Sequence, residues 1–186
     1  MNRLNPPTQF LVDSLPTLPK GRVLDVAAGS GRNALFLAEH GFTVHAIDRN
    51  PEALLVLQSA ARERRLLQVT TEIVDLETAE TGEDLLPSEV YDVVVVFFYL
   101  YRPLFPALLR SLKPGGMLVY ETFLLENYLR HQRPKSREFC LETYKLLTLI
   151  QGLHLLHYDE GVRRGREGQA QRFTARLLAQ KDQPEQ

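Results

Sequence analysis

A chain of 186 residues is long enough to bury one substantial hydrophobic core, and its 44% hydrophobic and 24% charged residues argue against wholesale disorder. No apolar run approaches the roughly 20 residues that span a bilayer, the start of the chain lacks the apolar segment of a secretory signal, and the single cysteine, Cys140, excludes an intrachain disulfide. We therefore expect one cytoplasmic domain over residues 1–186, with residues 1–20 as an extension or short helix.

The formal net charge of −1 hides an asymmetry between the two parts of the chain. Residues 1–109 carry 9 Lys and Arg against 14 Asp and Glu, a balance of −5, whereas residues 110–186 carry 13 against 9, a balance of +4. Proteins that bind duplex nucleic acid usually have a stronger basic surface, so no nucleic-acid partner is expected. The basic part is compatible with a small anionic substrate, although a solvated surface of mixed charge is the simpler explanation.

Predicted strands and helices alternate along the first part of the chain, which indicates βαβ units around a parallel sheet. Gly41 is well placed to end the first helix, and Asn50 followed by Pro51 gives the second helix an N-cap and a favoured first residue. The predicted strands lie at residues 23–27, 42–47 and 69–74, and the helices at residues 32–40 and from Pro51 toward Arg65.

The second part of the chain continues the same alternation. Residues 91–98 form a nearly uninterrupted, valine-rich apolar run, which is typical of a central strand covered on both faces. Seven strands with interleaved helices leave no room for a second domain, so the predicted fold is a doubly wound α/β domain. The remaining elements are a helix from Pro103 to about Lys113, a strand at 117–123, a helix at about 137–150, and strands at 153–158 and 173–178, joined by the polar segment 159–171.

The strongest motif is the glycine-containing turn after the first strand, where Asp25 precedes Ala27-Ala28-Gly29-Ser30-Gly31. Glycines let a ligand approach the backbone N–H groups at the carboxyl edge of the sheet without meeting a Cβ atom. An acid at the end of the next strand, Asp48, can accept two hydrogen bonds from the hydroxyls of a ribose. Together these features predict a nucleoside-binding crevice at the switch point of the sheet.

The turn alone does not identify the nucleoside, because residues 29–34 also match the dinucleotide pattern G-x-G-x-x-A. Asp25 favours S-adenosylmethionine, since a buried carboxylate needs a partner and would be satisfied by an α-ammonium group but repelled by a pyrophosphate. An NAD-type Rossmann oxidoreductase and a catalytically silent cofactor-binding or interaction module remain the alternatives. The absence of an appended binding domain and the near-neutral charge disfavour an RNA methyltransferase.

At these residues the chain resembles the class I S-adenosylmethionine-dependent methyltransferases, in particular the tellurite-resistance (TehB-like) group. The resemblance covers most of the chain from about residue 20, and it implies a Rossmann-like sheet of seven strands with the last one antiparallel. One departure is Ala27-Ala28, where the family often has Gly-Cys, a change that narrows the space at the methionine end of the cofactor. The matching segments are LDVAAGSGRNALFLAEHGFTVHAIDRNPEAL, YDVVVVFF, LKPGGMLVYETF and, more weakly, RFTARLLAQK.

The same resemblance implies a set of cofactor contacts. The turn that begins at Asp25 would surround the methionine moiety, Asp48 would hold the ribose, and Asp75 would face the adenine amino group. Two phenylalanines at the end of the fourth strand would lie near the reacting methyl group, although alternation along a strand places at least one of them in the core. The expected cofactor-binding residues are Asp25, Ala27, Gly29, Gly31, Arg32, Asn33, Asp48, Arg49, Asp75, Leu76, Phe97 and Phe98.

Methyl transfer from a sulfonium is an in-line displacement in which the protein mainly supplies proximity and alignment. A soft nucleophile needs little help from a base, and the sequence contains no compact base constellation. Residues 97–102 also lack the Asn/Asp-Pro-Pro-aromatic run of many N-methyltransferases. The expected acceptor is therefore a small molecule, such as a metalloid oxyanion or another soft nucleophile; the sequence pattern favours no particular oligomeric state.

Candidate residues for the acceptor side are Tyr99, His131, Arg133 and Arg164, with Arg163 as an alternative to Arg164. In this hypothesis His131 and Arg133 lie in a loop after the fifth strand and close over an anionic substrate, although solvated loop charges are the simpler explanation. The histidines lack the spacing of a metal-binding set, so no metal is expected. Cys140 is expected inside the predicted helix at 137–150 as a small core residue.

Overall fold

The computed structural model describes residues 5–77, 85–164 and 171–183. Residues 1–4 of the predicted N-terminal extension, 78–84 of the polar stretch after the third strand, and 165–170 of the predicted connection 159–171 lie outside the described residues. In the described parts, no helix has the length and apolar content needed to cross a bilayer.

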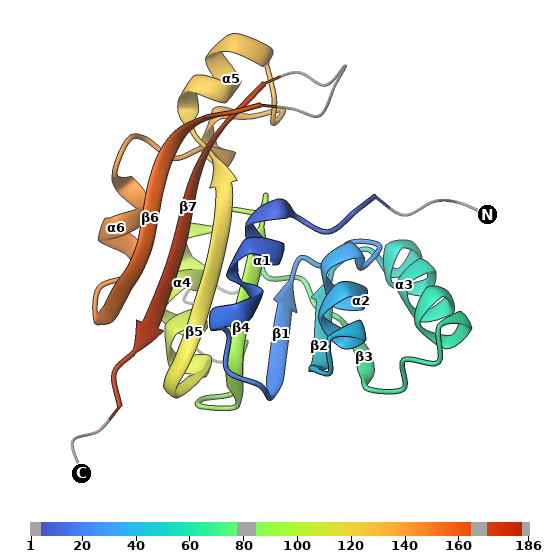
Figure 1. Ribbon diagram of the computed structural model, residues 1–186. Coiled ribbons are helices and arrows are strands. Elements are labelled where there is room, and N and C mark those ends of the chain that lie inside the picture. The colour runs from blue at the N-terminus through green and yellow to red at the C-terminus, as the bar shows by residue number, and fades with distance from the viewer. Residues whose placement is uncertain (1–4, 78–84, 165–170, 184–186) are drawn as a thin grey trace.

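Seven strands form one mixed sheet in the order β3-β2-β1-β4-β5-β7-β6 (Figure 1). Neighbouring strands among β1 to β5 are parallel, and β7 lies antiparallel between β5 and β6, which confirms the predicted sheet with its antiparallel last strand. The strands are β1 (Arg22–Val26), β2 (Thr43–Asp48), β3 (Val69–Ile73), β4 (Tyr91–Phe97), β5 (Leu112–Phe123), β6 (Leu153–Arg163) and β7 (Arg172–Lys181).

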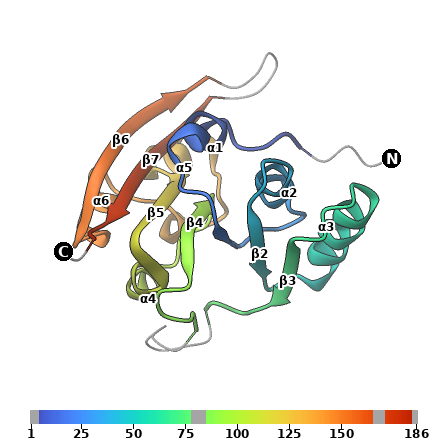
Figure 2. The ribbon, with the colours of Figure 1, turned by 60° about the horizontal axis from the view of Figure 1, so that its bottom comes forward.

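Helices cover both faces of this sheet, and Figure 2 shows α4 on the face opposite α1 and α2. The side chains of β4 alternate between the two layers: Val93 and Val95 pack with the helices α1 to α3, whereas Val94 and Val96 pack with α4 and α6. All four valines are fully buried, as predicted for a central strand. The helices are α1 (Gln9–Ser14), α2 (Arg32–Glu39), α3 (Pro51–Glu63), α4 (Phe105–Ser111), α5 (Leu125–His131) and α6 (Lys145–Leu149).

Local sequence signals fix the ends of the helices that flank the first strands. Gly41 adopts a left-handed conformation with φ +83° directly after α2, as its position predicted. Asn50 caps α3: its side-chain oxygen accepts hydrogen bonds from the N–H groups of Glu52 at 3.0 Å and Ala53 at 3.2 Å. The Asn50 cap fixes the start of α3 beside the carboxyl end of β2, where the candidate site lies.

The predicted helix over residues 137–150 is wrong. A 3-10 turn at Arg137–Phe139 is followed by an extended stretch, and only α6 is helical in this region. The extended stretch forms because Leu141 makes a parallel bridge with Leu124, which uses backbone groups that a helix would need. Cys140 therefore lies in extended backbone rather than in a helix, and its 2% exposure confirms the prediction that it is a core residue.

The predicted loop after the fifth strand is instead a helix. His131 is the last residue of α5, and Arg133 follows two residues later. An ion pair one helical turn apart, between Glu126 and Arg130 at 2.6 Å, supports this short helix. The prediction missed it because α5 is only two turns long and has no side-chain N-cap.

The last two strands are longer than predicted. Residues 159–163, expected in the polar connection, continue β6 and pair antiparallel with the start of β7. His154 and His157 both lie within β6. β5 also begins earlier than predicted, at Leu112, with the Pro-Gly-Gly segment forming an irregularity in its pairing with β4. The long hairpin arises because backbone pairing tolerates polar side chains on an exposed strand.

Candidate functional site

The turn after β1 changes the chain direction sharply at the carboxyl edge of the sheet. Ala27, Gly29 and Gly31 all have positive φ, at 54°, 56° and 80°. The N–H of Ala28 donates to the carbonyl oxygen of Ile47 in β2 at 3.0 Å, which attaches the turn to the neighbouring strand. Gly31 is the N-cap of α2, so the turn leads directly into that helix.

The two glycines of this turn have different environments. A Cβ atom on Gly29 would meet nothing within 4 Å, so this backbone borders open space. A Cβ atom on Gly31 would overlap the side chain of Leu57 in α3. Gly29 is therefore the glycine that leaves room for a ligand, whereas Gly31 allows close packing between the turn and α3.

Asp48, at the end of β2, is held in a fixed orientation by two backbone donors. Its Oδ2 accepts a hydrogen bond from the N–H of Gly29 at 2.8 Å, and its Oδ1 accepts one from the N–H of Asn50 at 2.8 Å. Each carboxylate oxygen can accept a further hydrogen bond. Asp48 thus joins the glycine turn to the start of α3 and presents a positioned acceptor.

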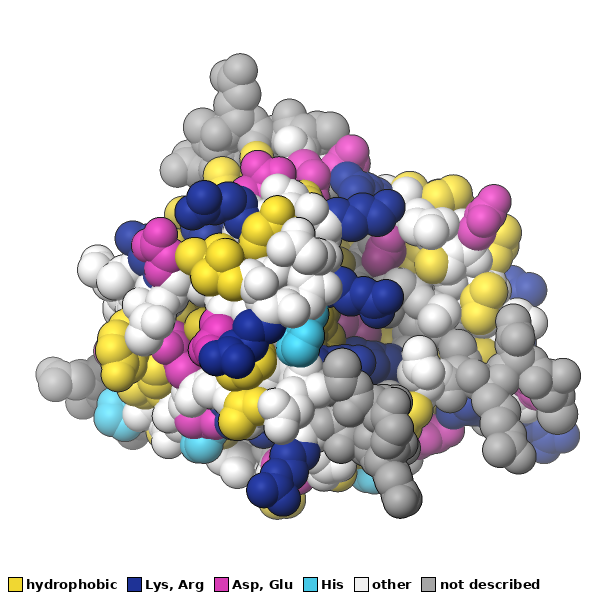
Figure 3. All heavy atoms as spheres, turned by 90° about the horizontal axis from the view of Figure 1, so that it is seen from above, with side chains coloured by type: hydrophobic (Ala, Val, Ile, Leu, Met, Phe, Trp, Pro, Cys, Tyr) yellow, Lys and Arg dark blue, Asp and Glu magenta, His cyan; other side chains and the backbone are white. Residues whose placement is uncertain are grey.

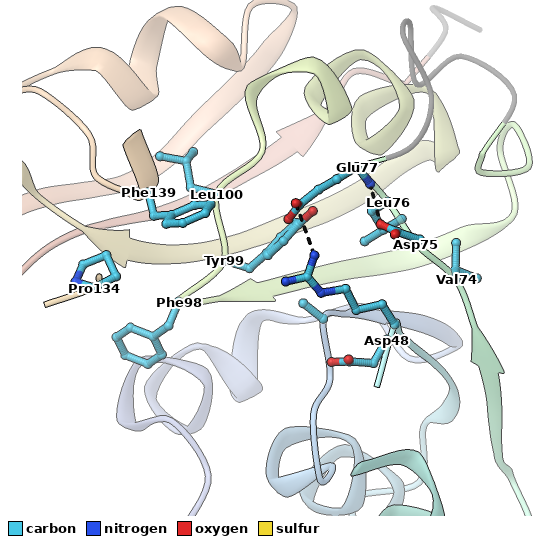
Figure 4. Close-up of a pocket in the computed structure, with 12 residues that line it drawn as sticks. Asp48, Val74, Asp75, Leu76, Glu77, Phe98, Tyr99, Leu100, Pro134 and Phe139 are labelled. Carbon is cyan, nitrogen blue, oxygen red and sulfur yellow. Dashed lines mark hydrogen bonds and ion pairs between the residues drawn. The ribbon is translucent and has the colours of Figure 1, made fainter. Parts of the chain in front are cut away.

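A cavity of about 300 Å³ lies beside Asp48, at the carboxyl ends of β1 to β4 (Figure 4). An ion pair between Arg49 and Glu77, 3.3 Å from Nη1 to Oε2, borders it, and the side chain of Tyr99 extends toward this pair. Burial raises the pKa of the Tyr99 hydroxyl. We call this the acidic cavity; it is lined by Ala27, Asp48, Arg49, Val74, Asp75, Leu76, Glu77, Phe98, Tyr99, Leu100, Pro134 and Phe139.

Asp25 lies in β1 beneath the turn and is only 2% exposed. Its Oδ2 has no hydrogen-bond partner among the described residues. Burial raises its pKa to about 7, against the smaller opposing effects of the Ala34 N–H and of Arg32. A cationic ligand group above the turn would therefore be favoured by the negative charge that Asp25 acquires when it ionises.

Six of the twelve expected cofactor contacts do not line the acidic cavity: Asp25, Gly29, Gly31, Arg32, Asn33 and Phe97. Asn33 is buried, and its Oδ1 accepts a hydrogen bond from the N–H of Thr8 at 2.9 Å, so it anchors the segment before α1. Phe97 is packed in the core between the sheet and α1 to α3. Arg32 lines two other cavities instead.

Phe98 stands between the acidic cavity and a second cavity, because it lines both. It follows β4 with a φ of 60°, and its N–H donates to the carbonyl oxygen of Glu121 at 2.7 Å. The guanidinium groups of Arg32 and Arg172 lie 5.6 and 5.5 Å from the centre of its ring. Such contacts between a cation and an aromatic face are attractive.

The second cavity, of about 400 Å³, is strongly cationic: among the described residues, five arginines and one glutamate line it. Burial and the nearby Arg172 lower the pKa of Arg32. Figure 3, which views the carboxyl edge of the parallel strands, shows Lys and Arg side chains gathered near the middle of this face. We call this the arginine cavity; it is lined by Asn5, Pro6, Pro7, Thr8, Gln9, Arg32, Phe98, Glu121, Arg163, Arg164, Arg172 and Arg176.

A third, smaller group of residues adjoins the arginine cavity and shares Arg32 and Arg172 with it. His131 and Arg133 belong to this group, whereas Arg163 and Arg164 line the arginine cavity itself. Tyr99, the remaining acceptor-side candidate, lies in the acidic cavity. The third cavity is lined by Arg32, Phe123, Asn127, His131, Arg133, Gln171 and Arg172.

The sequence-based prediction missed Arg172, Arg176 and Glu121, together with the segment Asn5–Gln9. Arg172 and Arg176 are an even number of residues apart in one strand, so they project from the same face of β7. That spacing could have identified them. In the part of the chain that the structure describes, no group of three or more His, Cys, Asp or Glu residues is arranged to hold a metal ion.

One protein family matches most of this chain. The family described as tellurite resistance protein TehB matches residues 5–172. A protein named hemagglutinin 1 from Eikenella corrodens is 31% identical over 159 residues, which are 81% of this chain and 49% of that protein. A protein named probable S-adenosyl-L-methionine-dependent methyltransferase TehB from Haemophilus influenzae is 29% identical over 106 residues, 55% of this chain and 35% of that protein.

The chain therefore spans about half or less of the length of these curated relatives. Among solved structures, the crystal structure of TehB from Haemophilus influenzae matches with a TM-score of 0.78 and 19% identity. The match covers 94% of this chain and 62% of that one. A likeness at this identity shows a shared fold.

Proposed function

This chain belongs to the TehB family of class I S-adenosylmethionine-dependent methyltransferases, and on that basis we propose that it binds S-adenosylmethionine in the acidic cavity and methylates a small acceptor in the arginine cavity. The observation that carries the proposal is the meeting of these two cavities at Phe98. In-line transfer needs the methyl carbon and the acceptor atom in direct contact, so the two ligands would meet past the edge of the Phe98 side chain, where the cavities adjoin.

The acidic cavity fits the donor. Asp48 would accept hydrogen bonds from the ribose hydroxyls, Asp75 would face the adenine amino group, and the open space at Gly29 would admit the methionine end. When bound, S-adenosylmethionine supplies a methyl group already activated by its sulfonium. The buried Asp25 favours a cationic ligand of this kind over the pyrophosphate of a dinucleotide, because its negative charge would repel phosphate.

The arginine cavity suits an anionic acceptor. A guanidinium group offers a planar fork of N–H donors that matches an oxyanion or a carboxylate. Arg164 and Arg172 would hold the anion, and His131 and Arg133 would extend the site toward solvent. We propose a soft nucleophile, either a metalloid oxyanion or a small thiol acid, because such a group attacks a methyl carbon with little base assistance.

Calorimetry separates this function from that of an NAD-type oxidoreductase. The purified protein is titrated with S-adenosylhomocysteine and, separately, with NAD. We expect binding of S-adenosylhomocysteine in the micromolar range and no heat from NAD. Binding of NAD alone, or no response to S-adenosylhomocysteine at millimolar concentration, would refute the proposed donor.

A screen of acceptors then tests transfer itself. Tellurite, selenite and small thiol acids are incubated with S-adenosylmethionine, and methylated products are detected by mass spectrometry, with Asp48→Ala as the inactive control. A protein that binds the donor product but methylates none of these acceptors would instead fit a silent cofactor-binding module.

A further inference from the structure

Glu121 is a buried acid in the wall of the arginine cavity. It lies near the carboxyl end of β5 and pairs with Phe97 in β4 and Arg176 in β7, so the three side chains share the sheet face that carries α1 and α2. Its exposed fraction is 3%. A carboxylate at this depth inside a cluster of arginines requires an explanation.

The two oxygens of this carboxylate are used differently. Oε1 accepts hydrogen bonds from the hydroxyl of Thr174 at 2.9 Å and from Nε of Arg176 at 3.2 Å. Oε2 is buried and has no hydrogen-bond partner among the described residues. Because Thr174 and Arg176 both donate to Oε1, neither of these two hydrogen bonds is made to Oε2.

A second buried oxygen in the same cavity is also without a partner among the described residues: the hydroxyl oxygen of Thr8, whose residue is 7% exposed. Buried polar atoms in folded proteins are nearly always hydrogen-bonded, and a carboxylate oxygen is particularly costly to leave unpaired. Two such atoms, both on residues that line one cavity, lead us to infer that a polar ligand completes their hydrogen bonds.

We propose that Oε2 of Glu121 accepts a hydrogen bond from the methyl acceptor, so that the cavity selects a small acid carrying both an anionic group and an O–H or N–H donor. This inference rests on the proposed function and names the acceptor class of the same site. The arginines bind the anionic group, and Glu121 binds the donor group. A fully deprotonated anion without a donor would face the Glu121 carboxylate with no compensating hydrogen bond, and the two negative charges would repel each other.

Matched pairs of acids test this selection directly. Wild-type protein saturated with S-adenosylhomocysteine is titrated with glycolate and acetate, and with 3-hydroxybenzoate and benzoate, and binding is followed by NMR. We expect each hydroxy acid to bind about tenfold more tightly than its partner, the effect of one hydrogen bond to a charged group. In Glu121→Gln this preference falls to about threefold or less, because a neutral amide oxygen is a weaker acceptor.

Glu126→Gln is the matched control, because it removes the same charge from an exposed side chain on α5 outside the arginine cavity. It should retain the full preference for hydroxy acids. Equal binding of both members of each pair to the wild type overturns the inference, and so does binding of none of the four acids. An equal gain of affinity for all four acids in Glu121→Gln also overturns it, since Glu121 would then act only through its charge.

Binding of S-adenosylhomocysteine distinguishes this inference from the proposed function. If the wild type and Glu121→Gln bind it alike while the hydroxyl preference is missing, only the acceptor class is wrong. If neither protein binds it, the proposed function itself is wrong. Unchanged binding in Glu121→Gln also shows that the variant is folded.

Discussion

The acidic cavity and the arginine cavity share Phe98 as a wall but are built in different ways. The acidic cavity collects residues at or just after the carboxyl ends of β1, β2, β3 and β4, which are four of the five neighbouring parallel strands. The arginine cavity joins the segment Asn5–Gln9, the first residue of α2, one residue of β5 and the β6–β7 hairpin. The acidic cavity therefore arises from the ends of successive strands and the residues that follow them, whereas the arginine cavity depends on contacts between segments that are distant in the sequence.

The charge asymmetry of the chain corresponds to this division. The acids of the first cavity, Asp48, Asp75 and Glu77, come from the part of the chain with a balance of −5. All arginines of the second cavity except Arg32 come from the part with a balance of +4. A cationic donor and an anionic acceptor would thus each meet the opposite charge, which raises the local concentration of both.

Replacing Asp48 should have the largest effect of the replacements considered, and it should act on donor binding in the acidic cavity. Asp48→Ala removes the proposed acceptor for the ribose hydroxyls, together with the hydrogen bonds from the N–H groups of Gly29 and Asn50. We expect the affinity for S-adenosylhomocysteine to fall about a hundredfold, because two hydrogen bonds to a charged group contribute about 3 kcal/mol. Calorimetry measures this loss, and Glu63→Gln, on the exposed surface of α3, is the control. A loss of affinity below about threefold would contradict the proposal that the donor binds in the acidic cavity.

The pKa of Asp25 should make donor binding depend on pH. Burial raises this pKa from its usual 3.8 to about 7, so the side chain is mainly protonated in acid and ionised above neutrality. The α-ammonium group of the ligand's amino-acid tail would favour the ionised form, and affinity for S-adenosylhomocysteine should therefore rise by more than tenfold between pH ~5.5 and ~7.5. Asp25→Asn should abolish this rise, whereas Asp13→Asn, at an exposed residue of α1, should keep it.

The same pKa has the opposite consequence for stability. Between pH ~4 and ~7 the folded protein holds a proton on Asp25 that the unfolded chain releases, so the free energy of unfolding falls as pH rises through this range. Chemical denaturation across this range should show a steeper fall in the wild type than in Asp25→Asn. Parallel curves for the two proteins would contradict the raised pKa.

Replacing Arg172 should weaken binding of the acceptor and leave binding of the donor unchanged. Its guanidinium lines the arginine cavity and the third cavity and packs on Phe98. With S-adenosylhomocysteine bound, Arg172→Ala should lower the affinity for selenite about tenfold, the contribution of one charge-assisted hydrogen bond, and leave donor binding unchanged. Arg137→Ala, an exposed arginine outside these cavities, should change neither. An equal loss of selenite affinity in Arg172→Ala and Arg137→Ala would show that only the overall charge of the protein matters.

The sequence predicted the parts of the molecule that depend on neighbouring residues. The valines of β4, the cap at Asn50 and the turn from Ala27 to Gly31 each carry their signal within a few positions, and the structure has each of them as expected. The helix predicted over residues 137–150 failed because a bridge between Leu141 and Leu124, distant in sequence, decides the backbone there.

The sequence predicted Arg163 and Arg164 on the acceptor side, but the rest of the arginine cavity escaped prediction for the same reason. Arg176 and Glu121 meet only because β7 inserts between β5 and β6, a pairing that no local pattern announces. The family resemblance also gave Asn33 a cofactor contact on the strength of its position after the glycine turn. In the structure the Oδ1 of Asn33 accepts a hydrogen bond from the N–H of Thr8, in a segment that precedes the first strand.

Asn33 provides the smallest effect and a direct test of which cavity it serves. Asn33→Ala leaves the N–H of the nearly buried Thr8 without its acceptor, so the free energy of unfolding should fall by about 1–3 kcal/mol. The segment Asn5–Gln9 forms part of the arginine cavity, and its release should weaken selenite binding a few-fold. Asn33→Asp keeps an acceptor oxygen and should restore both stability and selenite binding. Calorimetry with S-adenosylhomocysteine should detect no change in either variant. A donor affinity that falls more than selenite affinity would instead assign Asn33 to the acidic cavity, and the two regions would no longer be separable at the start of α2.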